Sequence, residues 1–442
     1  MYGCQQILIN SNGELKAILE YVCTEANKLS NCGLYYARQM YFKGGKIVSK
    51  FDLHKQLTKN LHFGALQSQT AQQTLTTIAE SFKSFIGLLK AYKKGTITER
   101  PKLPNYRKQG LTLVTYPSQA VKLIDGQLRF LLGSKVKTWF GLDAFYLPMP
   151  SNLDYKSIRE FRILPRNGCF YIEFVYKLER EVFRAEASVR RASQVLSDVN
   201  PDFVLGIDPG LNNWLTCISN VRTSFIVDGK HLKSLNQLYN KQISTIKEKK
   251  PQGFWSNKLA AITEKRNRQM RDAVNKAARK VINHCLNNKI GTLVFGWNKG
   301  QKDKSNMGRV NNQKFVFVPT ARLKDRINQL CEQYKIKFVE TERLFSDELF
   351  IRKEASESYT SKASFVDNDF LPIYGEKPTN WKSSGKRTKR GLFRTANNQY
   401  INADCNGASN IIRKVSTTLG LDLSGVSSGA LLTPLRVHIW TT

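Results

Sequence analysis

The order of the apolar segments between residues 203 and 415 constrains the fold of this chain more than any other feature. The segment FVLGIDPGLNNWLTCISN predicts two strands around a tight turn, and TSFIVDG predicts a third strand. The segments that follow alternate between helix and strand: a helical stretch over 232–289 that Pro251 and Gly253 break near its start, strand 291–297, helix 320–335, strand 336–342 and a last helix from about residue 402. This order predicts an α/β domain.

The same order is expected of a ribonuclease-H-like fold, in which acidic residues from the first strand, a later strand and the last helix converge on divalent metal. Asp208 ends the apolar run FVLGI, and Asp404 lies where the last helix begins. Each has a second interpretation, since Asp208 can open an Asp-Pro-Gly turn and Asp404 can simply favour the positive end of a helix dipole. Local sequence does not decide between the two interpretations.

The first half of the chain follows a different pattern. Residues 5–9 form a short apolar run that predicts one strand, and apolar residues spaced three and four apart predict helices over 12–42 and about 51–95. From 111 to 182, short apolar runs alternate with turn residues and predict β structure. An Asp-Gly pair at 125–126 lies between two such runs and predicts a hairpin.

The charge of the chain favours a polyanionic partner. It carries 69 Lys and Arg against 35 Asp and Glu, a net charge of +34 that points first to nucleic acid. Both halves are basic, with 29 basic and 15 acidic side chains in residues 1–200 and 40 and 20 in residues 201–442. No apolar run reaches the ~18 residues of a membrane span, and no secretory signal is evident. The eight Cys form no CxxC pair, so no zinc ribbon is expected.

Three basic clusters are candidates for phosphate contact. Residues 241–289 hold 13 Lys and Arg against 3 Asp and Glu, and repulsion between like charges disfavours an ordinary solvated helix face there. A solvated loop explains the cluster at 100–108 equally well. Such contacts set affinity and salt dependence rather than sequence choice. The candidates are Arg100, Lys102, Arg107, Lys108, Lys265, Arg266, Arg268, Arg271, Lys276, Arg279, Lys280, Lys386, Arg387, Lys389 and Arg390.

Several motifs in residues 203–415 resemble the TnpB family, which are transposon-encoded RNA-guided nucleases related to compact type V CRISPR effectors. GIDPGLNN and INADCNGASNIIRKV resemble the first and third RuvC motifs of that family. Between them, in the family's order, lie VDGKHLKSLNQLYNK, KRNRQMRDAVNKAARKVINHCLNNKIGTLVFGWNKGQK, ESYTSKASFVDND and SGKRTKRGLFR. The front half is similar in architecture only, as a strand, a helical insert and a β-rich region.

The resemblance implies a ribonuclease-H-like (RuvC) nuclease domain of α/β type, preceded by a wedge-type β-barrel with a helical recognition insert. The wedge domain would take its first strand from 1–10 and its barrel from 101–185, around a helical recognition domain at 11–100. A linker at 186–202 would lead to the first part of the nuclease domain at 203–342. An inserted, loop-rich region would follow at 343–400, and 401–442 would supply the last helix and a C-terminal tail.

The chain departs from the common family pattern around its third carboxylate. Gly296 stands where the second-motif Glu is usual. A subset of the family places that Glu just before a Tyr-Thr-Ser-Lys segment, and here 14 residues, 343–356, separate that segment from the strand end VETE. Motif spacing favours Glu357, while a rigid position at the tip of a strand favours Glu342. Glu340 lies on the same strand face as Glu342. We choose Glu357.

The function implied by the resemblance is Mg²⁺-dependent, RNA-guided cleavage of DNA. Asp208, Glu357 and Asp404 would bind two Mg²⁺ ions as hard oxygen ligands, and no zinc is expected. The expected partners are a guide RNA and double-stranded target DNA with a short flanking motif. The chain would act as a monomer in the cytoplasm or nucleoid of a prokaryote, without a membrane partner.

Other functions compete with this one. The main alternative is a catalytically silent RNA-guided DNA-binding protein that blocks transcription, which Gly296 and the interrupted Glu segment keep open. A CRISPR effector would use the same chemistry and differ only in the source of its guide. A transposase that joins DNA ends is disfavoured, because the resemblance is to the accessory nuclease.

Overall fold

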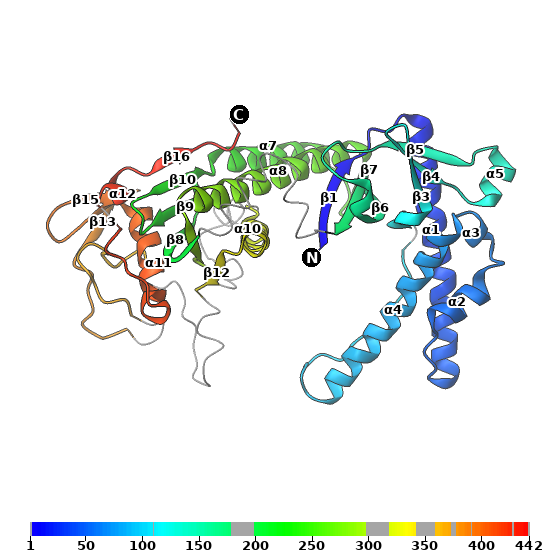
Figure 1. Ribbon diagram of the computed structural model, residues 1–442, viewed down its shortest axis with the longest axis horizontal. Helices are drawn as coiled ribbons and strands as arrows, with labels where there is room; N and C mark the ends of the chain where they lie inside the picture. The colour runs from blue at the N-terminus through cyan, green and yellow to red at the C-terminus, as the bar shows by residue number, and fades with distance from the viewer. Residues whose placement is uncertain are drawn as a thin grey trace. The chain divides into compact units, whose positions relative to one another are not determined.

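The computed structural model describes residues 2–108, 110–177, 199–297, 318–341, 359–372, 377–389, 391–426 and 428–440. The chain divides into two compact units, Met1–Val182 and Phe183–Thr442 (Figure 1). One apolar core lies in the first unit and two lie in the second. Among the described helices, none combines the length and the apolar character that crossing a membrane requires.

The helices of the first unit are α1 (Gly13–Gly44), α2 (Lys50–Leu57), α3 (Leu61–Gly64) and α4 (Ser68–Lys93). α1 begins where the side chain of Asn12 accepts a hydrogen bond from Leu15 N, and it ends at Gly45, whose φ is 63°. The single helical stretch expected over 51–95 is wrong in one respect, because it is divided into three helices. Asn60 and Gln67 take non-helical backbone angles and cap α3 and α4 with their side chains.

Two antiparallel sheets complete the first unit. The first has the order β1 (Tyr2–Leu8), β7 (Cys169–Lys177), β6 (Ile158–Arg166), β2 (Val114–Pro117), and the second has the order β3 (Val121–Ile124), β4 (Gln127–Leu131), β5 (Ala144–Pro148). A short helix, α5 (Ser134–Phe140), separates β4 from β5.

The hairpin predicted at the Asp-Gly pair is confirmed. Ile124 pairs with Gln127 across Asp125 and Gly126, whose φ angles of 47° and 74° suit a two-residue turn. The two sheets share one apolar core, in which aromatic rings of β4 and β5 stack with their centroids 4.9 Å apart. The described strands are hydrogen-bonded as two separate sheets, and closure into a wedge-type barrel stays a prediction.

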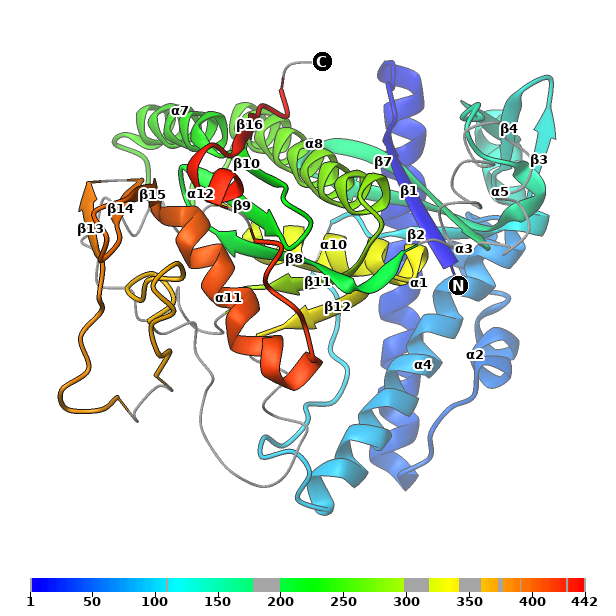
Figure 2. The same cartoon turned by 60° about the vertical axis from the view of Figure 1, so that its left-hand side comes forward.

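A six-stranded sheet forms the centre of the second unit, in the order β12-β11-β8-β9-β10-β16 (Figure 2). Its strands are β8 (Asn200–Pro209), β9 (Asn213–Ser219), β10 (Ser224–Asp228), β11 (Ile290–Phe295), β12 (Lys337–Glu340) and β16 (Leu435–Val437). β9 runs antiparallel to both of its neighbours, β8 and β10, whereas β11, β12 and β16 each run parallel to a neighbour. The predicted order of strands and helices over 203–342 is confirmed, as is the last helix, with 232–289 divided into two helices. β16 is a strand that the sequence did not indicate.

The remaining helices of this unit are α7 (Lys230–Lys247), α8 (Asn257–Asn287), α10 (Thr320–Tyr334), α11 (Ala403–Leu419) and α12 (Ser428–Leu432). The region 343–400, expected to be irregular, contains most of a small antiparallel sheet. Its strands are β13 (Lys386–Lys389), β14 (Leu392–Arg394) and β15 (Tyr400–Asn402), and β15 leads directly into α11.

Alternation along β8 decides which of its side chains face which helices. Leu205 and Ile207 belong to the core that includes α8 and α10, whereas Val204 belongs to the core that includes α11. Gly206 also lies on the α11 side, where a Cβ would come within 2.3 Å of Ile412 Cγ1. Because successive side chains of a strand point to opposite faces, Asp208 lies on the α11 side of the sheet.

Candidate active site

Asp208 lies within β8 and not in the turn that follows it. It pairs with Thr216 of β9 in the antiparallel ladder. The turn comes after Pro209, where Gly210 N donates to Trp214 O at 3.1 Å. A carboxylate held by a buried strand has a defined position, which a ligand for metal requires.

Asp404 is the second residue of α11. The side chain of Asn402 caps this helix by accepting hydrogen bonds from Asp404 N at 3.0 Å and Cys405 N at 3.1 Å. An acidic residue in the first turn also suits the helix dipole. Both interpretations of Asp404 therefore fit its position, because its side chain also reaches the wall of a cavity.

That cavity brings the two aspartates together. Asp208 and Asp404 line one space of about 390 Å³, and the other polar side chains in its wall include Asn213, Lys230, Arg387 and Arg436. Gly407 allows the close approach of α11, because a Cβ at this position would lie 2.8 Å from Asp208 Oδ2. The first strand of the sheet and the last long helix thus contribute carboxylates to the same place.

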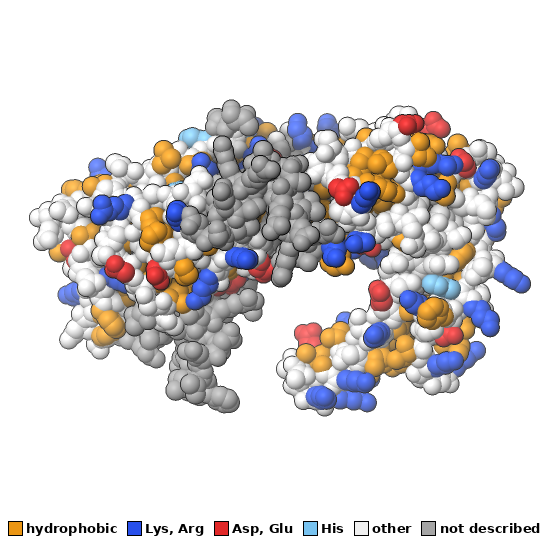
Figure 3. Space-filling view, viewed as in Figure 1, with side chains coloured by type: hydrophobic (Ala, Val, Ile, Leu, Met, Phe, Trp, Pro, Cys, Tyr) orange, Lys and Arg blue, Asp and Glu red, His pale blue; other side chains and the backbone are white. Residues whose placement is uncertain are grey.

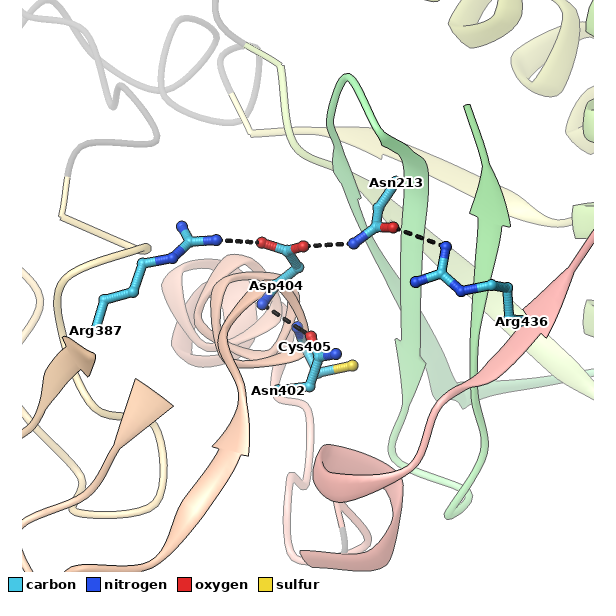
Figure 4. Close-up of polar contacts among 6 residues, drawn as sticks. All are labelled: Asn213, Arg387, Asn402, Asp404, Cys405 and Arg436. Atoms are coloured by element: carbon cyan, nitrogen blue, oxygen red, sulfur yellow. Dashed lines mark hydrogen bonds and ion pairs between the residues drawn. The ribbon is translucent and has the colours of Figure 1, made fainter. Parts of the chain in front are cut away.

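Both carboxylate oxygens of Asp404 are hydrogen-bonded (Figure 4). Oδ1 accepts from Arg387 on β13 at 2.9 Å, in an ion pair whose arginine side chain is 43% exposed. Oδ2 accepts from Asn213 Nδ2 on β9 at 2.6 Å. Arg387 was expected to contact nucleic acid, and here it neutralises a candidate metal ligand.

A second ion pair lies behind Asn213. Arg436 of β16 donates from one nitrogen to Asn213 Oδ1 at 3.1 Å and to Asp228 Oδ2 at 2.9 Å. The other oxygen of Asp228 accepts from Lys230 N at 2.7 Å, and the Asp228 side chain is only 7% exposed. Behind Asn213 and Arg436 of the cavity wall there is therefore a nearly buried acidic side chain, both of whose oxygens accept hydrogen bonds.

The chemistry of the donors fits a hard divalent cation. Carboxylate oxygens such as those of Asp208 and Asp404 are the ligands that Mg²⁺ prefers. Burial, together with the neighbouring Asp404 and Asp208 charges, raises the pKa of the Cys405 thiol, and Cys405 is not among the residues that line the cavity. The oxygen donors of the cavity wall therefore fit Mg²⁺.

The third carboxylate is not assigned by the described residues. Glu357, our choice, and Glu342 lie outside them. Glu340 is described, and it forms an ion pair with Lys324 at 2.8 Å rather than lining the cavity. No set of three or more His, Cys, Asp or Glu within the described ranges is arranged to hold a metal ion. Gly296 N donates to Ile207 O at 2.9 Å, so it lies beside the residue that precedes Asp208.

The predicted basic residues of α8 fall into two groups. In the first group, each side chain contacts a neighbouring residue. Arg266 donates hydrogen bonds to the side chain of Asn236 and lies over the ring of Tyr239. Arg271 forms an ion pair with the buried Glu264 at 2.8 Å, and Arg279 donates a hydrogen bond to Tyr334 Oη at 2.8 Å. Lys276 forms an exposed pair with Asp272. The second group is exposed and forms no ion pair with another described residue: Lys265, Arg268 and Lys280. The charges of Arg271 and Lys276 are therefore compensated within the described residues, whereas those of the second group are exposed and have no acidic partner there.

The basic connector near residue 100 is tied to α1. Asn31 accepts from Arg107 N and donates to Arg107 O, and Asn27 donates to Lys108 O. The guanidinium of Arg107 donates to Thr112 Oγ1 at 2.7 Å. The side chains of Arg100, Lys102 and Lys108 are exposed. Hydrogen bonds thus fix the backbone of this segment while its lysines stay at the surface.

The third predicted cluster lies near the cavity. Lys386 and Lys389 are exposed on β13 beside Arg387, and Arg390 lies outside the described residues. Lys and Arg side chains are otherwise distributed over the visible face of each unit (Figure 3).

Three cavity residues were not predicted from the sequence. Asn213 and Lys230 stand inside quoted motifs, GIDPGLNN and VDGKHLKSLNQLYNK, and these motifs were an available signal. Arg436 had no such signal, because it comes from a three-residue strand near the end of the chain.

Comparison with known proteins supports the resemblance in part of the chain. A family model described as "Probable transposase" (OrfB_IS605), the TnpB-like family, matches residues 174–301. A comparison with curated proteins finds no match.

Two solved structures align with this chain over most of their length. A cryo-EM structure of a Cas12f1–sgRNA–target DNA complex has 15% identity over 93% of this chain and 98% of that chain, with a TM-score of 0.33. A cryo-EM structure of a CRISPR-Cas12f ternary complex has 14% identity over 90% and 82%, with a TM-score of 0.33. Scores of this size do not establish a common fold over the whole chain.

Proposed function

We propose, on the premise that this chain is TnpB-like over residues 174–301, that it is an RNA-guided DNA endonuclease with a ribonuclease-H-like catalytic domain. One observation carries the proposal, namely that Asp208 of the first strand of the sheet and Asp404 of α11 line the same cavity. A chain with a net charge of +34 and two such carboxylates suits a polyanionic substrate cut with the help of divalent cations.

The strand order of the second unit supports this assignment. β8, β9 and β10 form an antiparallel series, and β11 and β12 extend the sheet in parallel on the other side of β8. A ribonuclease-H-like domain is expected to have this arrangement, with its carboxylates on the first strand and the last helix. The helices and the two sheets of the first unit would then serve as the recognition insert and the wedge that grip guide RNA and flanking duplex.

The side chains of the cavity would divide the work between them. Asp208 and Asp404 would hold divalent cations, with Glu357 as the third carboxylate. Bound Mg²⁺ would activate the attacking water and stabilise the charge that develops on the phosphate. Lys230 and Arg387 would lie beside that phosphate and offset its negative charge. Guide pairing would select the target, and the protein would read a short flanking motif and the shape of the hybrid.

The test is cleavage by the complex of the full chain with its co-expressed RNA. The RNA is sequenced, and the complex is incubated in Mg²⁺ with a plasmid library whose target is flanked by random sequence. We expect Mg²⁺-dependent cuts next to one flanking motif. Asp208→Ala and Asp404→Ala should each lower cleavage by at least about 10³-fold, while RNA and target binding stay within about twofold of wild type.

Asp202→Ala is the matched control, because Asp202 is an exposed aspartate at the start of the same strand. It should cleave like wild type. Cleavage at the wild-type rate by Asp208→Ala would overturn the assignment of this residue. Target binding without any cleavage by wild type would instead identify a silent DNA-binding protein, and a chain that purifies without RNA would exclude both functions.

A further inference from the structure

The C-terminal strand reaches the candidate active site through one side chain. β16 pairs in parallel with β10, with Arg436 opposite Ile226. The segment is anchored beyond the strand, since Ile439 is buried in the core and the ring of Trp440 lies 4.5 Å from the ring of His231. Arg436 is thus presented to the cavity by a segment that is well fixed to the sheet.

Asp228 fixes the guanidinium of Arg436. The carboxylate is nearly buried and accepts from Arg436 at 2.9 Å, while its second oxygen is held by the backbone of Lys230. The Asp228 side chain is 7% exposed and that of Arg436 is 39% exposed, so removal of Arg436 would leave a nearly buried carboxylate without this cation. The same Arg436 nitrogen that meets Asp228 also donates to Asn213 Oδ1.

The amide of Asn213 therefore has only one favourable orientation. A guanidinium can only donate hydrogen bonds, and an ionised carboxylate can only accept them. With Arg436 on one side and Asp404 on the other, Oδ1 must face Arg436 and Nδ2 must face Asp404 (Figure 4). The reversed amide would place its NH₂ group against the guanidinium and its oxygen against the carboxylate.

The fixed amide of Asn213 in turn orients the carboxylate of Asp404. Its Oδ2 is held by Asn213 at 2.6 Å, which fixes the rotation of the carboxylate. Its Oδ1 accepts from Arg387, whose side chain is 43% exposed and would have to give way to a bound metal ion. We propose that Arg436 is a positioning residue that acts through Asn213 to orient Asp404 toward divalent metal, so that the C-terminal strand is part of the active site. This inference rests on the proposed function.

The experiment compares four variants of the full chain: Arg436→Gln, Asn213→Ala, the double variant and Arg436→Lys. Binding of Mn²⁺ to the RNA-bound protein is followed by the electron paramagnetic resonance signal of free Mn²⁺, with Asp404→Ala marking the contribution of this site. Single-turnover cleavage is measured against Mg²⁺ concentration. Residues that orient a metal ligand typically contribute about tenfold or more to metal affinity.

We expect Arg436→Gln and Asn213→Ala each to weaken Mn²⁺ binding about tenfold. Cleavage should fall at low Mg²⁺ and recover in part at high Mg²⁺, with target binding unchanged. Because Arg436 acts through Asn213, the double variant should be no worse than Asn213→Ala. Arg436→Lys keeps a donor-only cation and should retain more Mn²⁺ affinity than Arg436→Gln.

Leu435→Gln is the control on the same strand, since Leu435 is 66% exposed. It should bind Mn²⁺ like wild type. Wild-type Mn²⁺ affinity in Arg436→Gln, or losses that multiply in the double variant, would overturn the inference. If Arg436→Gln does not fold, as judged by circular dichroism, Asn213→Ala and Arg436→Lys decide the question.

The same measurements distinguish failure of the proposed nuclease function from failure of the positioning role of Arg436. If wild type never cleaves DNA yet its Mn²⁺ affinity depends on Arg436 and Asn213 as expected, the positioning role stands without the nuclease. If wild type cleaves DNA and the variants match it in Mn²⁺ affinity and Mg²⁺ dependence, the nuclease stands without the positioning role.

Discussion

The ion pair between Glu340 and Lys324 argues against a role of Glu340 as a metal ligand. Glu340 lies on β12, opposite Phe295 of β11, and its carboxylate meets Lys324 at 2.8 Å with only 10% of its side chain exposed. The same lysine lies 4.6 Å from the centre of the Trp297 ring. A carboxylate paired in this way serves the packing of α10 on the sheet, and we therefore separate Glu340 from the candidates for the third ligand.

This separation predicts different results for three Glu-to-Gln variants. Glu357→Gln should abolish cleavage, as loss of a metal ligand does, whereas Glu340→Gln should keep cleavage within about threefold of wild type and lower the free energy of unfolding by about 1–3 kcal/mol. The measurements are single-turnover cleavage and thermal unfolding. Glu342→Gln is the comparison, and loss of cleavage in that variant with full activity in Glu357→Gln would move the ligand to residue 342.

At the scale of the element, α8 both packs against the sheet and carries basic side chains at the surface. Its apolar side packs against the sheet through residues such as Ala277 and Val281. Arg266, Arg271 and Arg279 bind neighbouring side chains, and the buried Glu264 depends on Arg271 for its ion pair. The high ratio of basic to acidic residues that the sequence showed is therefore partly structural, and only part of it faces a partner.

These two groups of α8 residues predict different effects of substitution, on RNA binding for the exposed group and on stability for the paired group. The triple variant Lys265→Ala, Arg268→Ala, Lys280→Ala should weaken RNA binding and lower the slope of log affinity against log salt by about 2–3, with unchanged unfolding. Arg271→Ala should instead lower the free energy of unfolding by about 3 kcal/mol, because it removes the ion pair between Arg271 and the buried Glu264. Filter binding between 50 and 300 mM KCl and thermal melts distinguish the two. An unchanged slope in the triple variant would remove α8 from the nucleic-acid surface.

At the scale of the whole molecule, the charge is shared by units that each have their own core. The first core is built from residues of the first unit and the other two from residues of the second. Basic residues outnumber acidic ones in both parts, and those of the first unit include the exposed side chains at 100–108. We infer that both units contribute to binding a long polyanion, each through its own surface.

Binding that draws on both units should depend steeply on salt. We expect the affinity of the chain for its RNA to fall by about 10³-fold or more between 50 and 200 mM KCl, since many phosphate contacts release counterions together. The measurement is a titration with labelled RNA at several salt concentrations. A loss below about tenfold would indicate few phosphate contacts and would contradict a binding surface of this extent.

Much of this could be predicted from the sequence because the signals are local. Apolar periodicity gave the strands β8 to β12 and the helices between them, and an Asp-Gly pair gave the hairpin after β3. The motifs around Asp208 and Asp404 identified two carboxylates that line one cavity. The division of 51–95 into three helices was missed, since capping by Asn60 and Gln67 competes with helix periodicity over only a few residues.

The sequence by itself determined the order of the elements from β8 to β12, the excess of positive charge and the two aspartates. Only the tertiary structure decided that Arg387 covers one oxygen of Asp404, that Arg271 belongs to Glu264, and that Arg436 reaches Asn213. The physical reason is distance along the chain. Periodicity and capping act between residues a few positions apart, whereas Asn213 and Arg436 are 223 positions apart and meet only because β16 adds to the edge of the sheet.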